Sequence, residues 1–443
     1  MNIAAHLDVD LIALEAAEQI TLMLDLTAPQ SDANKDRPAQ AVQIVLDRSG
    51  SMDGPPLDAA KGSLLKLIDR LSPQDFFGLV VFDDTANVAV PTRAMADHNI
   101  FELRHAIATM HSGGSTDISA GYLLGLREVK RVQAPGGSTV LLVSDGHANA
   151  GEQQPEFFTE VSAKLAQEKI TTATIGLGNG YDETILEALA QGGGGAHRFA
   201  ANIDEAITAI SAEVDDLLAK SVVNAVLRLK PLPGMHGAPT IELLQRLPYW
   251  MDGDTYVVQL GDLYAGENRR FVIGISVPEI ASLGLCTIAE ITIEYLNLAQ
   301  RQDISVTLPV NVNVVPGDQA AGRIANPIVR AQRLVISAQT EKALASEEMK
   351  NGNVKGAMKR LNDSANILMH ESSLIDTDDE RAQETKTILR AEAEELGKLA
   401  HDAEYEAPEY NIKRMNESYS RKTRSREFRN VHLDPLIDPE ELH

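Results

Sequence analysis

Short apolar runs alternate with longer amphipathic stretches between residues 40 and 220, and this alternation constrains the fold more than any other feature. The apolar runs resemble strands in length and composition (43–46, 77–82, 87–90, 139–143, 171–175 and 197–200). The stretches between them have the apolar spacing of helices (57–71, 100–110, 118–132, 155–167, 181–191 and 203–219). This order predicts an α/β fold, a doubly wound and mostly parallel sheet with helices on both faces. Ligands of such sheets bind at the carboxyl ends of the strands, where the strand order reverses.

The sequence on either side of this α/β domain (38–220) has a different pattern of apolar and polar residues. Residues 221–316 contain strand-like runs separated by turn residues, a pattern typical of an antiparallel β-sandwich. Residues 1–37 contain strand-like stretches at 3–11 and 19–27, which we expect to join the sandwich, so that the α/β domain is inserted into it. Residues 317–404 have helical periodicity. Residues 405–443 are expected to be a polar tail, loosely ordered or ordered by packing on a partner or another domain.

Charge and cysteine content exclude several classes of function. The chain of 443 residues has a net charge of −24, which argues against non-specific binding to nucleic acid or to anionic membranes. Its single cysteine, Cys286, excludes an intramolecular disulfide and a thiolate metal cluster. The N-terminus carries acids where a signal peptide would be basic, and no apolar run reaches about 18 residues. We therefore expect a cytoplasmic protein.

Three loops that follow predicted strands or precede predicted helices present oxygen-bearing side chains. The first, VLDRSGSMDG (45–54), leaves a strand and presents Asp47, Ser49 and Ser51 at alternate positions. The second, SGGSTDI (112–118), presents Thr116, and the third, LLVSDG (141–146), ends a strand at Asp145. Hydroxyl and carboxylate oxygens suit Mg²⁺, Mn²⁺ or Ca²⁺ and not a soft metal. Because parallel strands deliver their carboxyl ends to one edge of the sheet, the two aspartates are predicted to meet across a metal ion.

Taken together, these stretches resemble the metal-ion-dependent adhesion site of the von Willebrand factor A domain. The resemblance covers residues 40 to 220 and implies that the metal ligands are Asp47, Ser49, Ser51, Thr116 and Asp145. It further implies hydroxyls on or near the ion, aspartates acting directly or through water, and one open position for a carboxylate of a protein ligand. Mg²⁺ fits best, with Mn²⁺ or Ca²⁺ as alternatives. Integrin β subunits extend the motif to DxSxSxxDD for a second ion, and since this chain has Gly54 there, we expect one ion.

The order of domains is similar to that of bacterial von Willebrand factor A proteins of the group related to calcium-activated chloride channel homologues and inter-α-trypsin inhibitor heavy chains. The resemblance favours a non-enzymatic, metal-dependent protein-binding module whose partner presents an Asp or Glu carboxylate. An alternative is a regulatory or adaptor subunit that docks on a separate AAA-type ATPase, since this chain has no P-loop. A metal-dependent hydrolase is less favoured, because the sequence positions no histidine or carboxylate pair as a base.

Individual residues of the motif also have simpler interpretations. Asp47 and Ser51 could cap the helix that follows them. Arg48 could orient an incoming acid, or pair with a local carboxylate. His147, two residues after Asp145, could touch a bound ligand, or it could be a solvated loop residue.

Overall fold

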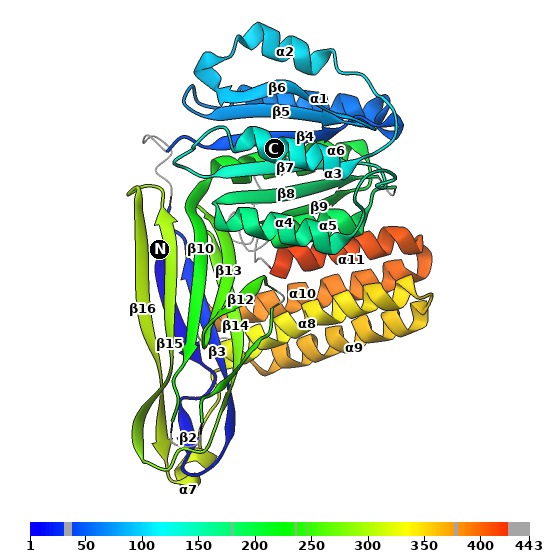
Figure 1. The fold of residues 1–443 in the computed structure, drawn as a ribbon. Helices are drawn as coiled ribbons and strands as arrows, with labels where there is room; N and C mark the ends of the chain where they lie inside the picture. The colour runs from blue at the N-terminus through cyan, green and yellow to red at the C-terminus, as the bar shows by residue number, and fades with distance from the viewer. Residues whose placement is uncertain (31–37, 179, 235–236, 246, 376–379, 424–443) are drawn as a thin grey trace, which may run out of the picture.

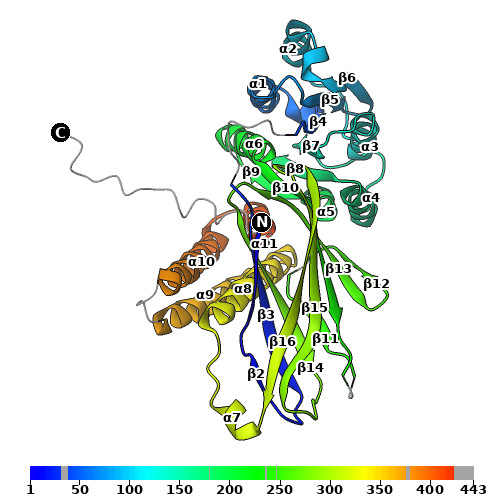
Figure 2. The same ribbon diagram turned by 90° about the vertical axis from the view of Figure 1, so that its left-hand side faces the viewer.

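The structure, a computed structural model, describes residues 1–30, 38–178, 180–234, 237–245, 247–375 and 380–423. These residues form an α/β domain, a β-sandwich and a helical bundle (Figure 1). The α/β domain lies at one end of the elongated sandwich, and the bundle packs against the side of the sandwich and below the α/β domain (Figures 1 and 2). The predicted combination of a mostly parallel sheet, an antiparallel sandwich and C-terminal helices is confirmed.

The sheet of the α/β domain has the strand order β6-β5-β4-β7-β8-β9. All neighbours pair in parallel except β5 and β6, which form an antiparallel hairpin at one edge. The central strand β4 is buried along its whole length, as expected for a strand covered on both faces. The strands are β4 (Ala41–Asp47), β5 (Phe76–Phe82), β6 (Ala86–Ala94), β7 (Ser138–Ser144), β8 (Ile170–Leu177) and β9 (Gly194–Ala200).

Two hydrophobic cores hold helices on the two faces of this sheet. One core joins the sheet to α1, α2 and α6, and the other joins it to α3, α4 and α5 (Figure 2). The strand order reverses at β4, whose neighbours β5 and β7 lead the chain in opposite directions across the sheet. The carboxyl end of β4 is therefore where a ligand is expected. The helices are α1 (Pro55–Ile68), α2 (Ile100–Ala108), α3 (Ile118–Val129), α4 (Pro155–Gln167), α5 (Glu183–Gly192) and α6 (Ile203–Leu218), with 3-10 turns at Gly50–Met52 and Met95–Asp97.

The sandwich is built from both sides of the α/β domain in the sequence. Its two sheets have the orders β1-β3-β14-β11 and β12-β13-β10-β15-β16-β2, so the N-terminal strands contribute to both. Their inner faces bury one continuous aliphatic core. The chain enters the α/β domain after β3 and returns at β10. The strands are β1 (Asn2–Leu7), β2 (Leu11–Ala13), β3 (Glu18–Thr27), β10 (Lys220–Pro231), β11 (Thr240–Leu243), β12 (Tyr249–Asp252), β13 (Thr255–Tyr264), β14 (Asn268–Val277), β15 (Gly284–Asn297) and β16 (Gln302–Val315).

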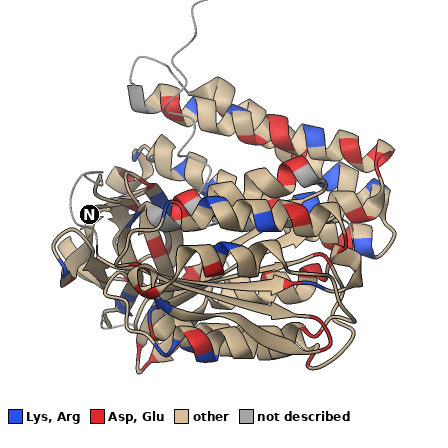
Figure 3. Cartoon of the chain, turned by 90° about the horizontal axis from the view of Figure 1, so that it is seen from above, with Lys and Arg blue, Asp and Glu red and all other residues tan. Residues whose placement is uncertain are grey.

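The helical region consists of the short α7 and a bundle with a common core. Charged residues of both signs are spread along the bundle helices (Figure 3). None of the helices within the described ranges is long and apolar enough to cross a membrane. The helices are α7 (Gly317–Ala321), α8 (Pro327–Lys350), α9 (Val354–Leu374), α10 (Glu380–Tyr405) and α11 (Pro408–Thr423).

The structure differs from the expected polar tail over the first part of residues 405–443. Residues 408–423 form α11, which packs on α8 and against the α/β domain at β9 and α5. The apolar periodicity is weak because polar side chains such as Asn411 and Lys413 occupy buried positions of this helix beside Ile412 and Met415. This segment is thus ordered by packing on another domain. Residues 424–443 lie outside the described residues.

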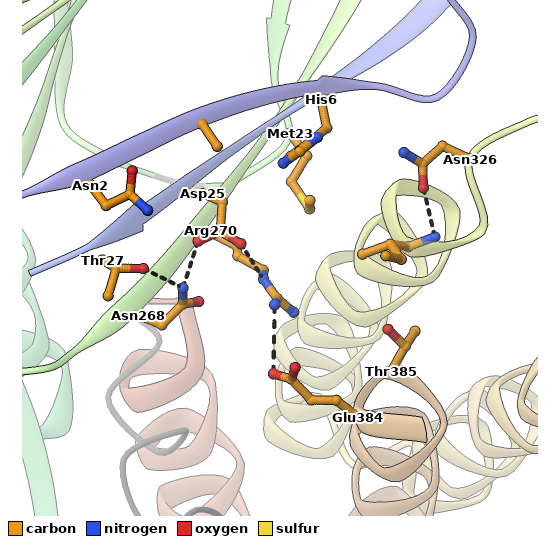
Figure 4. A pocket seen from close by; sticks show the side chains of 12 residues that line it. Asn2, His6, Met23, Asp25, Thr27, Asn268, Arg270, Asn326, Glu384 and Thr385 are labelled. Atoms are coloured by element: carbon orange, nitrogen blue, oxygen red, sulfur yellow. Dashed lines mark hydrogen bonds and ion pairs between the residues drawn. The ribbon is translucent and has the colours of Figure 1, made fainter. Parts of the chain in front are cut away.

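Polar contacts join the bundle to the outer face of the sandwich. A cavity of about 290 Å³ lies between β1, β3 and β14 on one side and α8 and α10 on the other (Figure 4). In it, Arg270 of β14 contacts Asp25 of β3 at 3.1 Å and Glu384 of α10 at 3.6 Å. The Arg270 guanidinium thus links a carboxylate of the sandwich to one of the bundle, and the cavity lies at the interface between these two domains. It is remote from the carboxyl end of β4 (Figure 1).

Candidate metal centre

Asp47 is the last residue of β4 and connects the ends of two neighbouring strands. Its Oδ1 accepts a hydrogen bond from the Ser49 amide at 2.7 Å, which turns the chain sharply as it leaves the strand. Its Oδ2 accepts one from the Ser144 hydroxyl at the end of β7. The carboxylate is fully buried. The predicted meeting of the β4 and β7 ends is therefore present, and Asp47 fixes it.

Ser49, Ser51 and Asp145 form a continuous chain of side-chain contacts. The two serine hydroxyls lie 3.1 Å apart, and the Ser51 hydroxyl donates to Asp145 Oδ1 at 2.8 Å. The helix-cap interpretation is wrong, because the residue that caps α1 is Gly54 and no side chain bonds to that helix end. The side chains of the DxSxS motif instead face the end of β7.

Thr116 reaches the same space from the loop before α3. The side chain of Asn149 accepts from its amide at 2.8 Å, and the Asn149 amide donates to the Thr116 carbonyl at 3.1 Å. A β-carbon on Gly146 would lie 2.9 Å from Thr116 Oγ1 and 3.6 Å from Ser49 Oγ. The two hydroxyls therefore flank one small space, which exists because residue 146 has no side chain. Such a cradle of oxygens fits a small hard cation.

The glycine-rich loop packs flat on the DxSxS loop through its backbone. The Gly50 amide donates to the Gly114 carbonyl at 3.1 Å, and the Gly113 amide donates to the Arg48 carbonyl. A β-carbon on Gly113 would lie 2.2 Å from the carboxylate of Asp83, so only glycine allows this approach. Arg48 pairs with the same carboxylate at 2.8 Å. Of the two alternatives from the sequence, the structure shows Arg48 as the partner of a local acid.

Both aspartates of the site have raised pKa values. Burial raises the pKa of Asp47, against the hydrogen bonds from Ser144 and Ser49. Burial also raises the pKa of Asp145 to about 6, helped by the negative charge of Asp47 and opposed by the Ser51 hydrogen bond. Two partly dehydrated carboxylates this close together favour the arrival of a cation.

The five predicted ligands offer two carboxylates and three hydroxyls, an all-oxygen set that fits Mg²⁺, Mn²⁺ or Ca²⁺. Within the described ranges, no group of three or more His, Cys, Asp or Glu side chains is arranged to hold a metal. The predicted site differs from such clusters because three of its five predicted ligands are Ser and Thr hydroxyls.

Sequence reasoning missed three residues that support this site. Ser144 bonds to Asp47, Asn149 holds Thr116 at both its amide and its carbonyl, and Asp83 anchors Arg48 beside the glycine loop. Ser144 directly precedes Asp145 at a strand end, which was an available signal. The other two act across loops, where the sequence has no fixed period. His147 is exposed, in line with a solvated loop residue.

Comparison with known proteins agrees with this geometry. Residues 42–213 match the family described as von Willebrand factor type A domain. The chain is 26% identical to the uncharacterized protein sll0103 of Synechocystis sp. over 366 residues, which cover 81% of this chain and 85% of that protein. It is 30% identical to human inter-alpha-trypsin inhibitor heavy chain H3 over 156 residues, 34% of this chain and 18% of that protein.

Two solved structures share the fold across nearly the whole chain. One is a von Willebrand factor type A protein from Catenulispora acidiphila, with a TM-score of 0.68 and 16% identity over 90% of this chain and 96% of that one. The other is the ArnB paralog VWA2 from Sulfolobus acidocaldarius, with a TM-score of 0.64 and 14% identity over 95% and 98%. From the sequence match, the sheet order and the arrangement at the end of β4, we conclude that residues 42–213 form a von Willebrand factor type A domain.

Proposed function

We propose that this chain is a non-enzymatic protein-binding module whose metal centre captures a carboxylate of a partner protein. The metal is Mg²⁺, with Mn²⁺ or Ca²⁺ as substitutes, and its ligands are Asp47, Ser49, Ser51, Thr116 and Asp145. The observation that carries the proposal is the space beside Gly146, flanked by the hydroxyls of Thr116 and Ser49. The contacts of the Ser51 hydroxyl with Ser49 and with Asp145 support it, because they bring these three predicted ligands together.

The balance of charge at the site favours an acidic ligand. The three hydroxyls are neutral, so the protein supplies at most two negative charges, those of Asp47 and Asp145. A bound divalent ion would supply a Lewis-acidic centre. The two carboxylates balance its charge without leaving an excess of negative charge at the site. A local cation of this kind explains how a chain with a net charge of −24 could bind an Asp or Glu side chain.

A single ion per site is also part of the proposal. Gly54 replaces an acid that a second adjacent ion would require, and Asp53 beside it already accepts a hydrogen bond from the Ser112 hydroxyl at 2.7 Å. Asp53 is therefore engaged in holding the glycine-rich loop.

Affinity capture from native cells tests this function. The wild-type chain and Thr116→Val, which removes one hydroxyl at nearly constant volume, serve as baits in Mg²⁺ and in EDTA. Thr109→Val, at an exposed threonine whose hydroxyl donates to the His105 carbonyl of α2, is the matched control. We expect a partner held by wild type and Thr109→Val in Mg²⁺, and lost in EDTA or with Thr116→Val.

Equal capture in EDTA would contradict the proposal. A partner whose binding survives replacement of each of its exposed acids would contradict the carboxylate part of it. Recovery of an AAA-type ATPase as the metal-dependent partner would assign the chain to the adaptor role within the same mechanism.

A further inference from the structure

Lys413 of α11 is buried against the loop that precedes α5. Its side chain is 3% exposed, and its ammonium donates to the Tyr181 carbonyl at 2.9 Å and to Glu183 Oε2 at 3.0 Å. The same ammonium lies 3.8 Å from the centre of the Tyr181 ring. A cation from the last described helix, 232 positions along the chain, thus holds one end of this loop of the α/β domain.

The other side of this loop lies against the metal centre. The Asp182 amide donates to the Gly146 carbonyl at 3.2 Å. A β-carbon on Gly180 would lie 3.4 Å from the Asp145 carbonyl, so the two loops are in contact there as well. The loop at 180–182 therefore supports both Asp145, a proposed ligand, and Gly146, whose missing side chain leaves the space between the hydroxyls.

The loop is stiff enough to transmit a displacement. The Tyr181 ring is completely buried, and its hydroxyl is 3.1 Å from His197 Nε2. His197 Nδ1 is in turn 2.9 Å from the Thr174 hydroxyl on β8. Gly176 lies so close to the ring that a β-carbon there would be 2.4 Å from it. Packed side chains with few alternative positions pass a shift on to their neighbours, since the interior has no free volume to absorb it.

We infer that Lys413 is a positioning residue of the metal centre, and that α11 couples the helical bundle to metal affinity. When α11 is docked, Lys413 holds the 180–182 loop against Asp145 and Gly146. When it is removed, the Tyr181 carbonyl and Glu183 lose a buried cation and the loop relaxes away from the ligands. By linkage, metal binding must tighten the docking of α11 by the same factor. This inference rests on the proposed metal function.

The contacts of α11 with the rest of the bundle are rich in polar groups, which suits a helix whose position responds to its surroundings. Ser418 accepts from Lys342 of α8 at 2.9 Å, and the Ser346 hydroxyl donates to Asn416 at 2.8 Å. On the α/β domain, Arg414 pairs with Glu205 at 3.0 Å. Polar seams of this kind are typical of interfaces between domains that move relative to one another.

Manganese titration followed by electron paramagnetic resonance tests the inference on the full chain. Lys413→Met retains the length of the side chain and removes its cation, and we expect Mn²⁺ affinity to fall by about 3- to 10-fold. Lys220→Met is the matched control. Lys220 is also a buried lysine at a domain seam, where it pairs with Asp262 and bonds to Thr139 at the opposite end of β7. We expect the control to bind Mn²⁺ within twofold of wild type.

Hydrogen exchange supplies a readout that a purely structural role would not change. Amides of residues 408–423 should exchange more slowly when Mn²⁺ is added to wild type, and should show no such response in Lys413→Met. If Lys413→Met does not fold, Glu183→Gln weakens the same contact: Lys413 keeps its hydrogen bond to the Tyr181 carbonyl but loses the opposite charge, and the same but smaller loss of affinity is expected.

Equal Mn²⁺ affinity in wild type and Lys413→Met, or α11 exchange that ignores the metal, would overturn the coupling while leaving the metal site intact. Failure of wild type to bind Mn²⁺ would overturn the proposed function itself.

Discussion

The ionised carboxylate of Asp145 lowers the stability of the metal-free fold but is the form that would bind a metal ion. Its pKa of about 6 is raised above the ordinary value of 3.8, so between these pH values the folded protein holds a proton that the unfolded chain releases. Without metal, the stability that the folded protein gains by holding this proton is therefore lost as the pH rises through 6. At pH 7 the ionised carboxylate destabilises the fold. Residues that serve binding at the expense of stability are common at functional sites.

Asp145→Asn should accordingly stabilise the metal-free protein. We expect the free energy of unfolding at pH 7 in EDTA to rise by about 1–2 kcal/mol, a value reduced from the full shift because the side chain is partly exposed. The same variant should gain no stability from Mg²⁺, whereas wild type should gain about 2.7 kcal/mol at a concentration 100 times its dissociation constant. Urea titrations with and without Mg²⁺ measure both. A variant less stable than wild type in EDTA would refute the assignment.

The same pKa predicts how metal binding depends on pH. Protons compete with the ion for Asp145 below about pH 6, so Mn²⁺ affinity should rise by up to about tenfold between pH 5 and 7 and then level off. Calorimetric titration at pH 5, 6, 7 and 8 checks this. Affinity that does not change between pH 5 and 7 would show that no ligand titrates in this range.

Gly146→Ala tests the space between the hydroxyls. Its β-carbon would meet Thr116 Oγ1 at 2.9 Å, so either this hydroxyl or the Asp145–Gly146 loop must shift. We expect Mn²⁺ affinity to fall at least tenfold. The control is Gly62→Ala in α1, where a β-carbon meets nothing within 4 Å, and this change should leave metal binding unchanged and stabilise the helix by about 0.5–1 kcal/mol. Unchanged affinity in Gly146→Ala would place the ion elsewhere.

At the scale of residues, the sequence indicated the candidate ligands but not what holds them. Asp47, Ser49 and Ser51 are readable because alternate positions of one loop share a direction. Asn149 and Asp83 were not readable, since each acts on a residue brought near it only by the closure of another loop.

At the scale of elements, α11 marks the limit of periodicity as a guide. The helices of the α/β domain have apolar stripes, and their predicted ranges agree with the structure to within a few residues. In α11 the buried face includes Asn411, Lys413 and Asn416, whose polar groups find partners on other elements. A helix buried through polar side chains looks like a solvated segment in the sequence. The short strands β11 and β12 give no clear signal in the sequence, because four residues are too few to establish an alternation.

Lys342 of α8 is a buried charged residue whose substitution measures how much buried ion pairs contribute to the stability of the bundle. It is fully buried and lies 2.7 Å from Glu392 and 3.2 Å from Glu395 of α10. Lys342→Met leaves these carboxylates without their cation, so we expect the protein to lose about 3 kcal/mol of stability. Lys398→Met, at an exposed position of α10, should cost less than about 0.5 kcal/mol. Urea titration compares them, and equal losses would mean that the buried pair contributes nothing specific.

At the scale of the whole molecule, the sequence indicated the kinds of domains and their order. The change of texture near residues 38 and 220 predicted an α/β domain between strands of a sandwich, and these strands do lie together in its sheets. The seams between domains were not predictable. Ion pairs such as Lys413 of α11 with Glu183 of α5 join residues from two domains, and neither sequence neighbourhood indicates the other.

The most direct test of the central claim is calorimetric titration of the full chain with Mn²⁺ at pH 7.5, for wild type, Thr116→Val and the control Thr109→Val. We expect one ion per chain in wild type and control, and binding that is lost or weakened at least tenfold in Thr116→Val. The absence of binding in wild type, or equal binding in all three proteins, would contradict it.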